Sequence, residues 1–278
     1  MNSSHHKEFY RILEAIQPHQ RLAETFQDFC RCAAIALAQP FYNNADWEQE
    51  YLRIIRKYSS EQAVKMAELF SIAVMAFEEN PKQDFLGEIF SQHGISSSYK
   101  EQFFTPYPVA TMMAQISLSD HENIIQKRGY ISVCEPCCGS GVMIIALRNV
   151  MIERGYNPSA QMLVTCMDID PLCCDMAYIQ LTLLGIAANV IHGDTLSMTT
   201  YCSTLTPLYF LNDWEQRCTR ADIAEKLVNV MKSASFQTAD FLPADTHIQQ
   251  ASFNDSAMAQ ALPSRRVRRG QEGQLVLW

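Results

Sequence analysis

The chain has 278 residues, of which 48% are apolar and 19% are charged. This composition is typical of a globular protein with a buried core, and 14 Phe, 11 Tyr and only 10 Gly exclude disorder as its main state. The formal net charge of −8 argues against a protein that coats a nucleic-acid backbone unaided, because phosphate binding needs clustered Lys and Arg. It is compatible with a nucleic-acid enzyme that has a local basic surface or a basic partner.

The ten cysteines do not have the placement of a disulfide framework, since several are immediate neighbours in the chain. Cys134 and Cys137 have the spacing of metal ligands, but the second pair of a structural zinc site is missing, so we predict no metal site. The N-terminus lacks the pattern of a secretory signal, and no stretch reaches the roughly 18 apolar residues of a membrane span. We therefore expect a cytoplasmic protein that does not enter a membrane.

Residues 7–92 are predicted to be helical, because apolar residues recur there at helical spacing. Pro40 is expected to close the second helix. Ser59, with Gln62 three residues later, has the spacing of a capping box and predicts the start of another helix. We predict that residues 1–100 form an N-terminal helical segment whose apolar stripe is the core of a helix bundle.

Strands and helices alternate after residue 100. Strands are predicted at 130–134, 162–167 and 189–191, with helices at 142–153 and 171–184 between them. This order, with short connections, is typical of a parallel sheet wound right-handedly, so the predicted fold is α/β. The pattern weakens afterwards, with a possible strand at 200–205 and a possible helix at 221–233. We assign residues 101–234 to the sheet domain and 235–278 to an irregular C-terminal tail.

Small or acidic residues follow the three predicted strands, at the edge where open parallel sheets bind their ligands. Gly139 and Gly141 allow a tight turn, so that the N-terminus of the next helix can face a polar ligand group. Asp168 ends the second strand, where a carboxylate can accept two hydrogen bonds from a ribose diol. Asp194 ends the third strand and can accept one from an exocyclic amine. Together the three loops predict a nucleoside pocket.

The pattern does not favour a dinucleotide as the ligand. The pyrophosphate-binding fingerprint needs a third glycine three residues after Gly141, and Ile144 occupies that position. Glu135, at the end of the first strand, would repel phosphate but suits a cationic sulfonium nucleoside that carries an ammonium group. His192 ends the third strand and is expected to form a pocket wall rather than to act as a base.

These motifs resemble those of the S-adenosylmethionine-dependent adenine-N6 DNA methyltransferases, in particular the modification subunits of type I restriction systems. Glu135-Pro-Cys-Cys-Gly-Ser-Gly is similar to the Asp-Pro-x-x-Gly-x-Gly motif of that family. Residues 102–110 are similar to its Gln-Phe-x-Thr-Pro segment, and residues 84–88 to the preceding helix. The resemblance covers about residues 84–196 and implies a class I methyltransferase (Rossmann-like) parallel sheet.

The resemblance also implies a cofactor, S-adenosyl-L-methionine, and the residues that would bind it. The implied cofactor contacts are Thr105 and Pro106 at the methionine end, Glu135, Pro136, Gly139 and Gly141 in the central part, Asp168 at the ribose and Asp194 at the adenine. DNA is the implied substrate. Because no base-reading segment is evident in the sequence, a specificity subunit or a second copy of the chain is the expected partner.

The catalytic motif of the family is missing. Its members carry Asn-Pro-Pro-Tyr or Asn-Pro-Pro-Phe after the fourth strand. The polar groups of this motif accept hydrogen bonds from the target amine, and its ring stacks on the flipped-out base. No Asn-Pro-Pro occurs in this chain. The nearest candidate is the segment 206–209, in which a hydroxyl replaces the amide. Thr206, Pro207 and Tyr209 are therefore the catalytic candidates, and an ordinary strand-end turn is the alternative.

The sequence thus predicts a methyltransferase of the adenine-specific DNA type, as in restriction-modification. Few residues follow the region of resemblance, so we expect the sheet to be truncated at its C-terminal end. The cluster Arg265–Arg269 would touch phosphate or form a solvated tail. The missing motif leaves a second hypothesis, a catalytically inactive protein that binds the cofactor or a partner and regulates. Methyl transfer to a protein or a small molecule is a third.

Overall fold

The computed structural model describes residues 4–17, 22–92, 95, 104–223, 226 and 274–276. The chain forms two compact units. One comprises residues 1–214 and 273–278, and the other comprises residues 215–272, of which 215–223 and 226 are described and helical. The predicted boundaries at residues 100 and 234 therefore do not separate the units, because the helical segment and the sheet share one of them.

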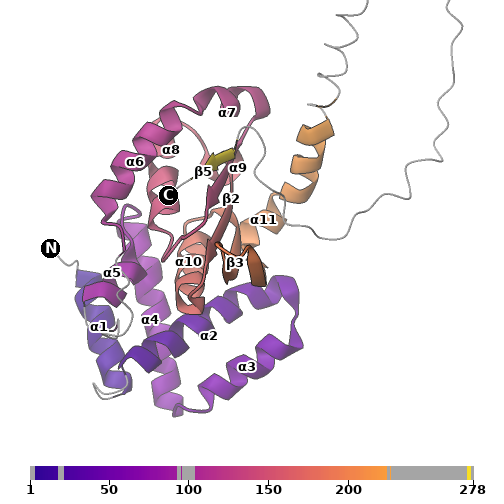
Figure 1. Ribbon diagram of the computed structural model, residues 1–278. Helices are drawn as coiled ribbons and strands as arrows, with labels where there is room; N and C mark the ends of the chain where they lie inside the picture. Colours follow the sequence, from indigo (N-terminus) through magenta and orange to yellow (C-terminus); the bar gives the residue numbers. More distant parts are fainter. Residues whose placement is uncertain are drawn as a thin grey trace, which may run out of the picture. The chain divides into compact units, whose positions relative to one another are not determined.

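The described residues of the N-terminal block, 4–17 and 22–92, form helices and their short connections (Figure 1). These are α1 (Ser4–Ile16), α2 (Leu22–Tyr42), α3 (Ala45–Ile55), α4 (Ser60–Glu79) and α5 (Phe85–Gln92). The predicted capping box is confirmed, since the Ser59 hydroxyl accepts from the Gln62 N–H and the Gln62 side chain accepts from the Ser59 N–H. Pro40 does not close the second helix as expected. It lies inside the last turn of α2, which ends two residues later.

In the part of the chain that the structure describes, the sheet has five strands in the order β4-β3-β2-β1-β5. They are β1 (Ile131–Glu135), β2 (Met162–Asp168), β3 (Ala187–Asp194), β4 (Thr199–Leu205) and β5 (Gln274–Val276). Strands β1, β2, β3 and β5 are parallel, which confirms the predicted α/β fold. Strand β4 is antiparallel to β3, because the connection 195–198 is too short for the crossover that parallel strands need. Strand β5 lies in the segment predicted to be an irregular tail.

Helices connect and cover the strands. They are α6 (Tyr107–Ser119), α7 (Glu122–Arg128), α8 (Val142–Glu153), α9 (Pro158–Gln161), α10 (Pro171–Leu183) and α11 (Pro207–Leu211). As predicted, α8 joins β1 to β2 and α10 joins β2 to β3. Helix α6 packs on α8, and α2 packs on α10 (Figure 1). Of the helix predicted at 221–233, only 221–223 and 226 are described. Among the described helices, none is both long and apolar enough to cross a membrane.

Aromatic packing and an ion-pair network fix the N-terminal block. The ring of Phe85, at the start of α5, lies 5.5 Å from that of Phe9 in α1. Arg31 of α2 donates to Glu50 of α3 at 2.7 Å and to Asp175 of α10 at 3.2 Å. The second contact ties the block to a helix that lies directly on the sheet, so the block and the sheet are held in one body.

Candidate functional site

Three loops meet at the carboxyl edge of the parallel strands, where the sequence predicts a nucleoside pocket. They are the glycine loop (residues 136–141) after β1, residues 169–170 after β2 and residues 195–198 after β3. The Gly139 N–H donates to Asp168 Oδ2 at 2.8 Å. The Thr195 hydroxyl donates to the Pro136 carbonyl. The three loops are thus joined by hydrogen bonds into one surface.

Neither the backbone conformation of Gly139 nor the space around it allows a side chain at this position. Its φ is +53°, in the left-handed region, and a Cβ would lie 2.9 Å from the ring of Phe104. Phe104 therefore packs directly against the glycine loop. Thr105 and Pro106, predicted at the methionine end of the cofactor, follow Phe104 in the chain, and Pro106 is the N-cap of α6. Residues 102–103 of the same motif lie outside the described residues.

Helix α8 begins directly after the glycine loop. Gly141 is its N-cap, with φ at +96°, and no side chain caps the helix. The first N–H groups of a helix have no partner within it and carry the positive end of its dipole. This end of α8 can therefore receive a polar group of a ligand.

Glu135 ends β1 as a buried carboxylate with 1% of its surface exposed. Its Oε1 accepts from the Cys137 N–H at 3.2 Å, whereas Oε2 has no hydrogen-bond partner among the described residues. Burial, together with the nearby charge of Asp168, raises the pKa of Glu135 to about 7 against the effect of the Cys137 N–H. An unpaired buried carboxylate oxygen is costly, and a cationic donor such as an ammonium group would satisfy it.

Asp168 ends β2 and uses one acceptor position on each of its oxygens. Oδ2 accepts from Gly139, and Oδ1 accepts from the Asp170 N–H at 2.9 Å. An ionised carboxylate can accept about four hydrogen bonds, so positions remain for two hydroxyl groups of a ribose. Ile169, the next residue, is 62% exposed and adds an apolar surface at the same edge.

Asp194 ends β3 and turns the chain toward β4. Its Oδ1 accepts the backbone N–H groups of Leu196 at 2.9 Å and Ser197 at 3.3 Å. Hydrogen bonds from Ser197 lower the pKa of Asp194. The side chain of Leu196 is 97% exposed. This loop therefore offers both a carboxylate acceptor and an apolar surface.

The predicted catalytic residues lie at the opposite edge of the sheet. Because β4 is antiparallel, its last residue, Leu205, pairs with Asn189 near the start of β3. Thr206 follows and is fully buried. Its hydroxyl donates to the Ile186 carbonyl at 2.7 Å and accepts from the Ala188 N–H at 2.9 Å.

The assignment of Thr206, Pro207 and Tyr209 as the catalytic motif is incompatible with this position. Thr206 is the N-cap of α11, Pro207 opens this helix and Tyr209 lies within it, so all three belong to the connection from β4 to α11. By contrast, β5 is parallel to β1, and Val276 pairs with Cys134. The carboxyl end of β5 therefore lies at the same edge as Glu135.

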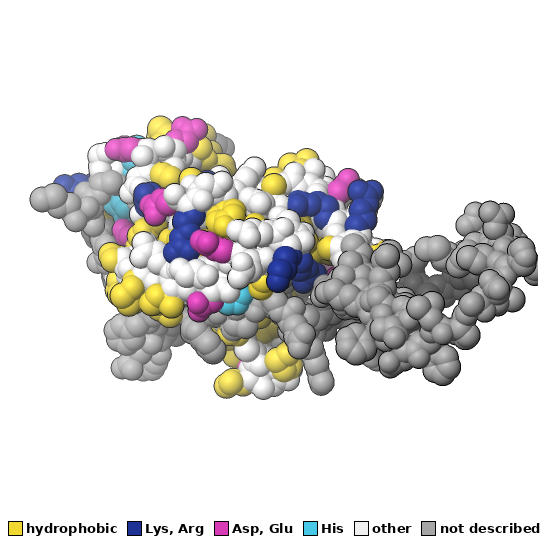
Figure 2. Space-filling model, turned by 90° about the horizontal axis from the view of Figure 1, so that it is seen from above, with side chains coloured by type: hydrophobic (Ala, Val, Ile, Leu, Met, Phe, Trp, Pro, Cys, Tyr) yellow, Lys and Arg dark blue, Asp and Glu magenta, His cyan; other side chains and the backbone are white. Residues whose placement is uncertain are grey.

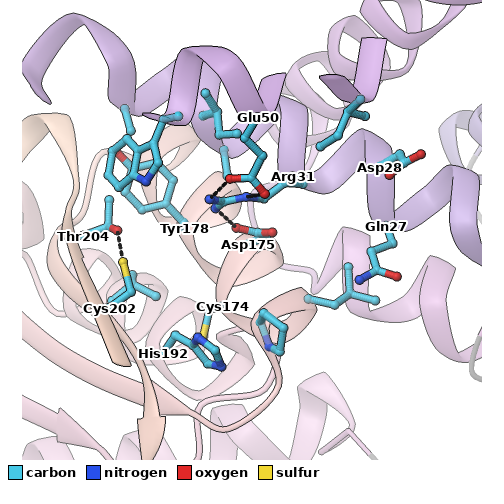
Figure 3. Close-up of a pocket in the computed structure, with 18 of the residues that line it drawn as sticks. Gln27, Asp28, Arg31, Glu50, Cys174, Asp175, Tyr178, His192, Cys202 and Thr204 are labelled. Carbon is cyan, nitrogen blue, oxygen red and sulfur yellow. Dashed lines mark hydrogen bonds and ion pairs between the residues drawn. The ribbon is translucent and has the colours of Figure 1, made fainter. Parts of the chain in front are cut away.

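A separate cavity of about 350 Å³ lies between the N-terminal block and the sheet (Figure 3). Its walls come from α2, α3, α10, β3 and β4. Figure 3 shows Arg31 between Glu50 and Asp175 at this cavity, and His192 on the side of the strands. His192 thus lines this separate cavity, and its predicted place in the wall of the nucleoside pocket stays a prediction. No residue of the glycine loop lines the cavity. The cavity is therefore distinct from the site that the three loops form at the carboxyl edge of the strands, called the edge site below.

Residues 81–216, about half of the chain, match the family described as N-6 DNA Methylase. Residues 81–216 belong to the N-6 DNA methylase family. The matched segment contains α5, the glycine loop, Asp168 and Asp194, so the predicted resemblance is confirmed where its motifs lie. A comparison with curated proteins found no match.

Two solved structures of methyltransferases are similar to part of this chain. One is a Listeria monocytogenes protein assigned to the class I S-adenosylmethionine-dependent methyltransferases, 15% identical over 70% of this chain and 55% of that one, with a TM-score of 0.34. The other is a type I restriction-modification methyltransferase subunit from Streptococcus thermophilus, 14% identical over 69% and 58%, with a TM-score of 0.35. The chain spans little more than half the length of either. Sequence identities and TM-scores this low do not show that the proteins share an activity.

A buried network of three residues, one in the glycine loop and two behind it, was not predicted from the sequence. Ser140 donates to Asp84 of the N-terminal block, and Gln180 of α10 donates to both. The only available signal was the position of Asp84 at the start of the segment 84–88 that resembles the family. A hydrogen bond between residues 56 positions apart leaves no local pattern in the sequence.

Replacing Glu135 by Gln should change how stability depends on pH. The folded pKa of about 7 exceeds the ordinary value of 4.5, so the folded wild type binds more protons between these pH values than the unfolded chain. Its free energy of unfolding should therefore fall as the pH rises through this window, relative to the variant, by at most about 3 kcal/mol. Urea unfolding of both proteins at pH 5 and pH 8 measures the difference. Parallel pH profiles would contradict the buried state of Glu135.

Replacing Thr206 by Val tests the correction of the catalytic assignment. The variant keeps the shape but leaves the Ile186 carbonyl and the Ala188 N–H without their buried partner, so it should lose about 1–3 kcal/mol of stability. Because Thr206 lies at the far edge, binding of ligands at the glycine loop should not change. Denaturant unfolding and ligand titration of the variant measure the two effects. A stable variant that has lost ligand binding would contradict the position of Thr206 away from the glycine-loop site.

Proposed function

We propose that the edge site binds S-adenosylmethionine and that the chain is a methyltransferase of the adenine-N6 DNA type. The observation that carries this proposal is the buried, unpaired Oε2 of Glu135 beside the glycine loop. This buried acceptor calls for a hydrogen-bond donor, which disfavours a phosphate group and fits the ammonium group of the cofactor. Membership of residues 81–216 in the N-6 DNA methylase family supports the same cofactor.

Each loop has groups suited to one part of that cofactor. Glu135 would pair with the ammonium group, and the α8 N-terminus after Gly141 would face its carboxylate. Asp168 has acceptor positions left for the ribose hydroxyls. Asp194 would accept from the adenine amine, while the exposed side chains of Ile169 and Leu196 would cover the faces of the ring. Thr105 and Pro106 would line the methionine end, next to Phe104.

When bound, the cofactor supplies a methyl group that is open to attack by a nitrogen nucleophile. The protein would hold the cofactor in one orientation and exclude water from the sulfonium. We place the methyl acceptor beside the carboxyl end of β5, because β5 is the strand next to β1 and ends at the edge of Glu135. The sequence contains no Asn-Pro-Pro motif, so no residue in the chain is assigned as the hydrogen-bond acceptor for the target amine.

DNA is the proposed substrate, with help from a specificity subunit or a second copy of the chain. On the face seen in Figure 2, the described Lys and Arg side chains lie in separate groups among acidic and uncharged ones. That view shows no continuous basic band over the described surface, and the net charge is −8. Since phosphate contacts dominate DNA affinity, a partner would supply much of the binding. We also place the protein in the cytoplasm, where its ten cysteine thiols would stay reduced.

The absence of Asn-Pro-Pro favours a second candidate, a protein that binds the cofactor without transferring its methyl group. In that case the chain would sense whether the cofactor is bound, or it would regulate a partner subunit. Methyl transfer to a protein or small molecule remains the third candidate, supported by the acidic charge. All three share the same cofactor site and differ in the step after cofactor binding.

Calorimetric titration with S-adenosylmethionine tests the shared part of these proposals. We expect wild type to bind, and Asp168→Ala to bind at least about tenfold more weakly, because the variant loses charge-assisted hydrogen bonds worth about 1.5–3 kcal/mol. Asp120→Ala, which removes an exposed carboxylate at the far end of α6, is the matched control and should bind as wild type does. A folded wild-type protein that does not bind would contradict the proposal.

A transfer assay then separates the three candidates. The protein is incubated with cofactor carrying a tritiated methyl group and with duplex DNA, and the DNA is digested to nucleosides. Label in N6-methyl-2′-deoxyadenosine supports the proposed enzyme. Binding without transfer to any acceptor supports the regulatory protein, and label only in protein or small molecules supports the third candidate.

A further inference from the structure

Asp84 is a buried carboxylate that joins the N-terminal block to the glycine loop. Only 3% of its surface is exposed, and it lies directly before α5. The Ser140 hydroxyl donates to Oδ2, while Gln180 Nε2 at 2.8 Å and the Gly87 N–H at 3.1 Å donate to Oδ1. Burial raises the pKa of Asp84, and these three donors oppose that rise by stabilising the ionised form. Both carboxylate oxygens are therefore engaged.

Gln180 of α10 closes the network. Its amide nitrogen also donates to the Ser140 carbonyl at 2.8 Å, and its amide oxygen accepts from the Leu86 N–H at 3.0 Å. Ser140 and Gln180 are fully buried. Two hydrogen bonds therefore hold the glycine loop at Ser140. Its hydroxyl binds Asp84, directly before α5, and its carbonyl binds Gln180 of α10. Well-satisfied buried networks of this kind specify one conformation.

Two further features show that the sequence of α5 fits this role. A Cβ at Gly87 would overlap the Asp84 carboxylate and the Ser140 hydroxyl, so only glycine lets the helix approach the loop so closely. The side chains of Phe85 and Ile89 are fully buried, and the Phe85 ring contacts that of Phe9. Helix α5 cannot shift without breaking this packing, and the position of the carboxylate is therefore fixed by the block.

From this network we infer that Asp84 is a positioning residue, which holds the glycine loop in its ligand-binding conformation through Ser140. The N-terminal block is then a working part of the cofactor site and not an accessory segment. Glu135 and Gly139 belong to the strand end and loop that carry Ser140, so a loop released from Asp84 would no longer place them together. The inference rests on the proposed function only where cofactor binding is the readout.

The test compares Asp84→Asn and Ser140→Ala with a matched control, Asp28→Asn. Asp28 is also a buried acid of the N-terminal block, but its partners are Lys57 and Tyr58, away from the glycine loop. We expect all three variants to melt at lower temperature than wild type. The first two should bind S-adenosylmethionine about tenfold or more weakly, and the double variant little more weakly than either. Asp28→Asn should bind within about twofold of wild type.

Hydrogen exchange without ligand provides the second readout. The amides of residues 137–141 should exchange faster in Asp84→Asn than in Asp28→Asn at matched loss of stability. Unchanged loop exchange in Asp84→Asn would overturn the inference, as would unchanged cofactor affinity, because either would make the residue merely structural. If wild type does not bind the cofactor, the proposed function fails, while the exchange comparison still decides whether Asp84 holds the loop.

Discussion

The hydrogen bond from the Gly139 N–H to the Asp168 carboxylate is the interaction on which the candidate site depends. It joins the loop after β1 to the end of β2, and the parallel pairing of Glu135 with Cys166 sets the register that lets the two groups meet. Backbone N–H groups bind one acceptor position on each oxygen of Asp168, and its remaining acceptor positions are left for a ligand. The same register sets the buried, unpaired oxygen of Glu135 next to that carboxylate, so a cationic group and a diol can be recognised within one nucleoside.

This arrangement is supported from behind by helices that precede it in the sequence. The Asp84 network fixes Ser140, and the bond from Arg31 to Asp175 fixes α10, which carries Gln180. Both contacts cross between the N-terminal block and the sheet. Because closely packed interiors transmit strain, a shift of these helices would also shift the loops of the site. A division at residue 100 would separate these helices from those loops.

The core of the fold could be predicted from the sequence because its signals are local. Buried runs, glycines past helix ends and Asp170-Pro171 at a helix start give the order of β1, α8, β2, α10 and β3. Strand direction and non-local contacts have no such signal. The segment 206–209 has fitting residue types, but the antiparallel course of β4 carries it to the wrong edge. Strand β5 is separated by a long segment from its neighbour β1, and Asp84 is 56 residues from Ser140, so neither pairing could be read from spacing.

Ultraviolet cross-linking of S-adenosylmethionine with a radioactive methyl group, followed by peptide mapping, tests the central claim most directly, because it compares the edge site with the separate cavity in one experiment. The account predicts saturable label in peptides that contain residues 135–141 or 168–170, which S-adenosylhomocysteine competes away. Label confined to peptides of α2 and α3, which line the cavity, would contradict it, as would label that no competitor displaces.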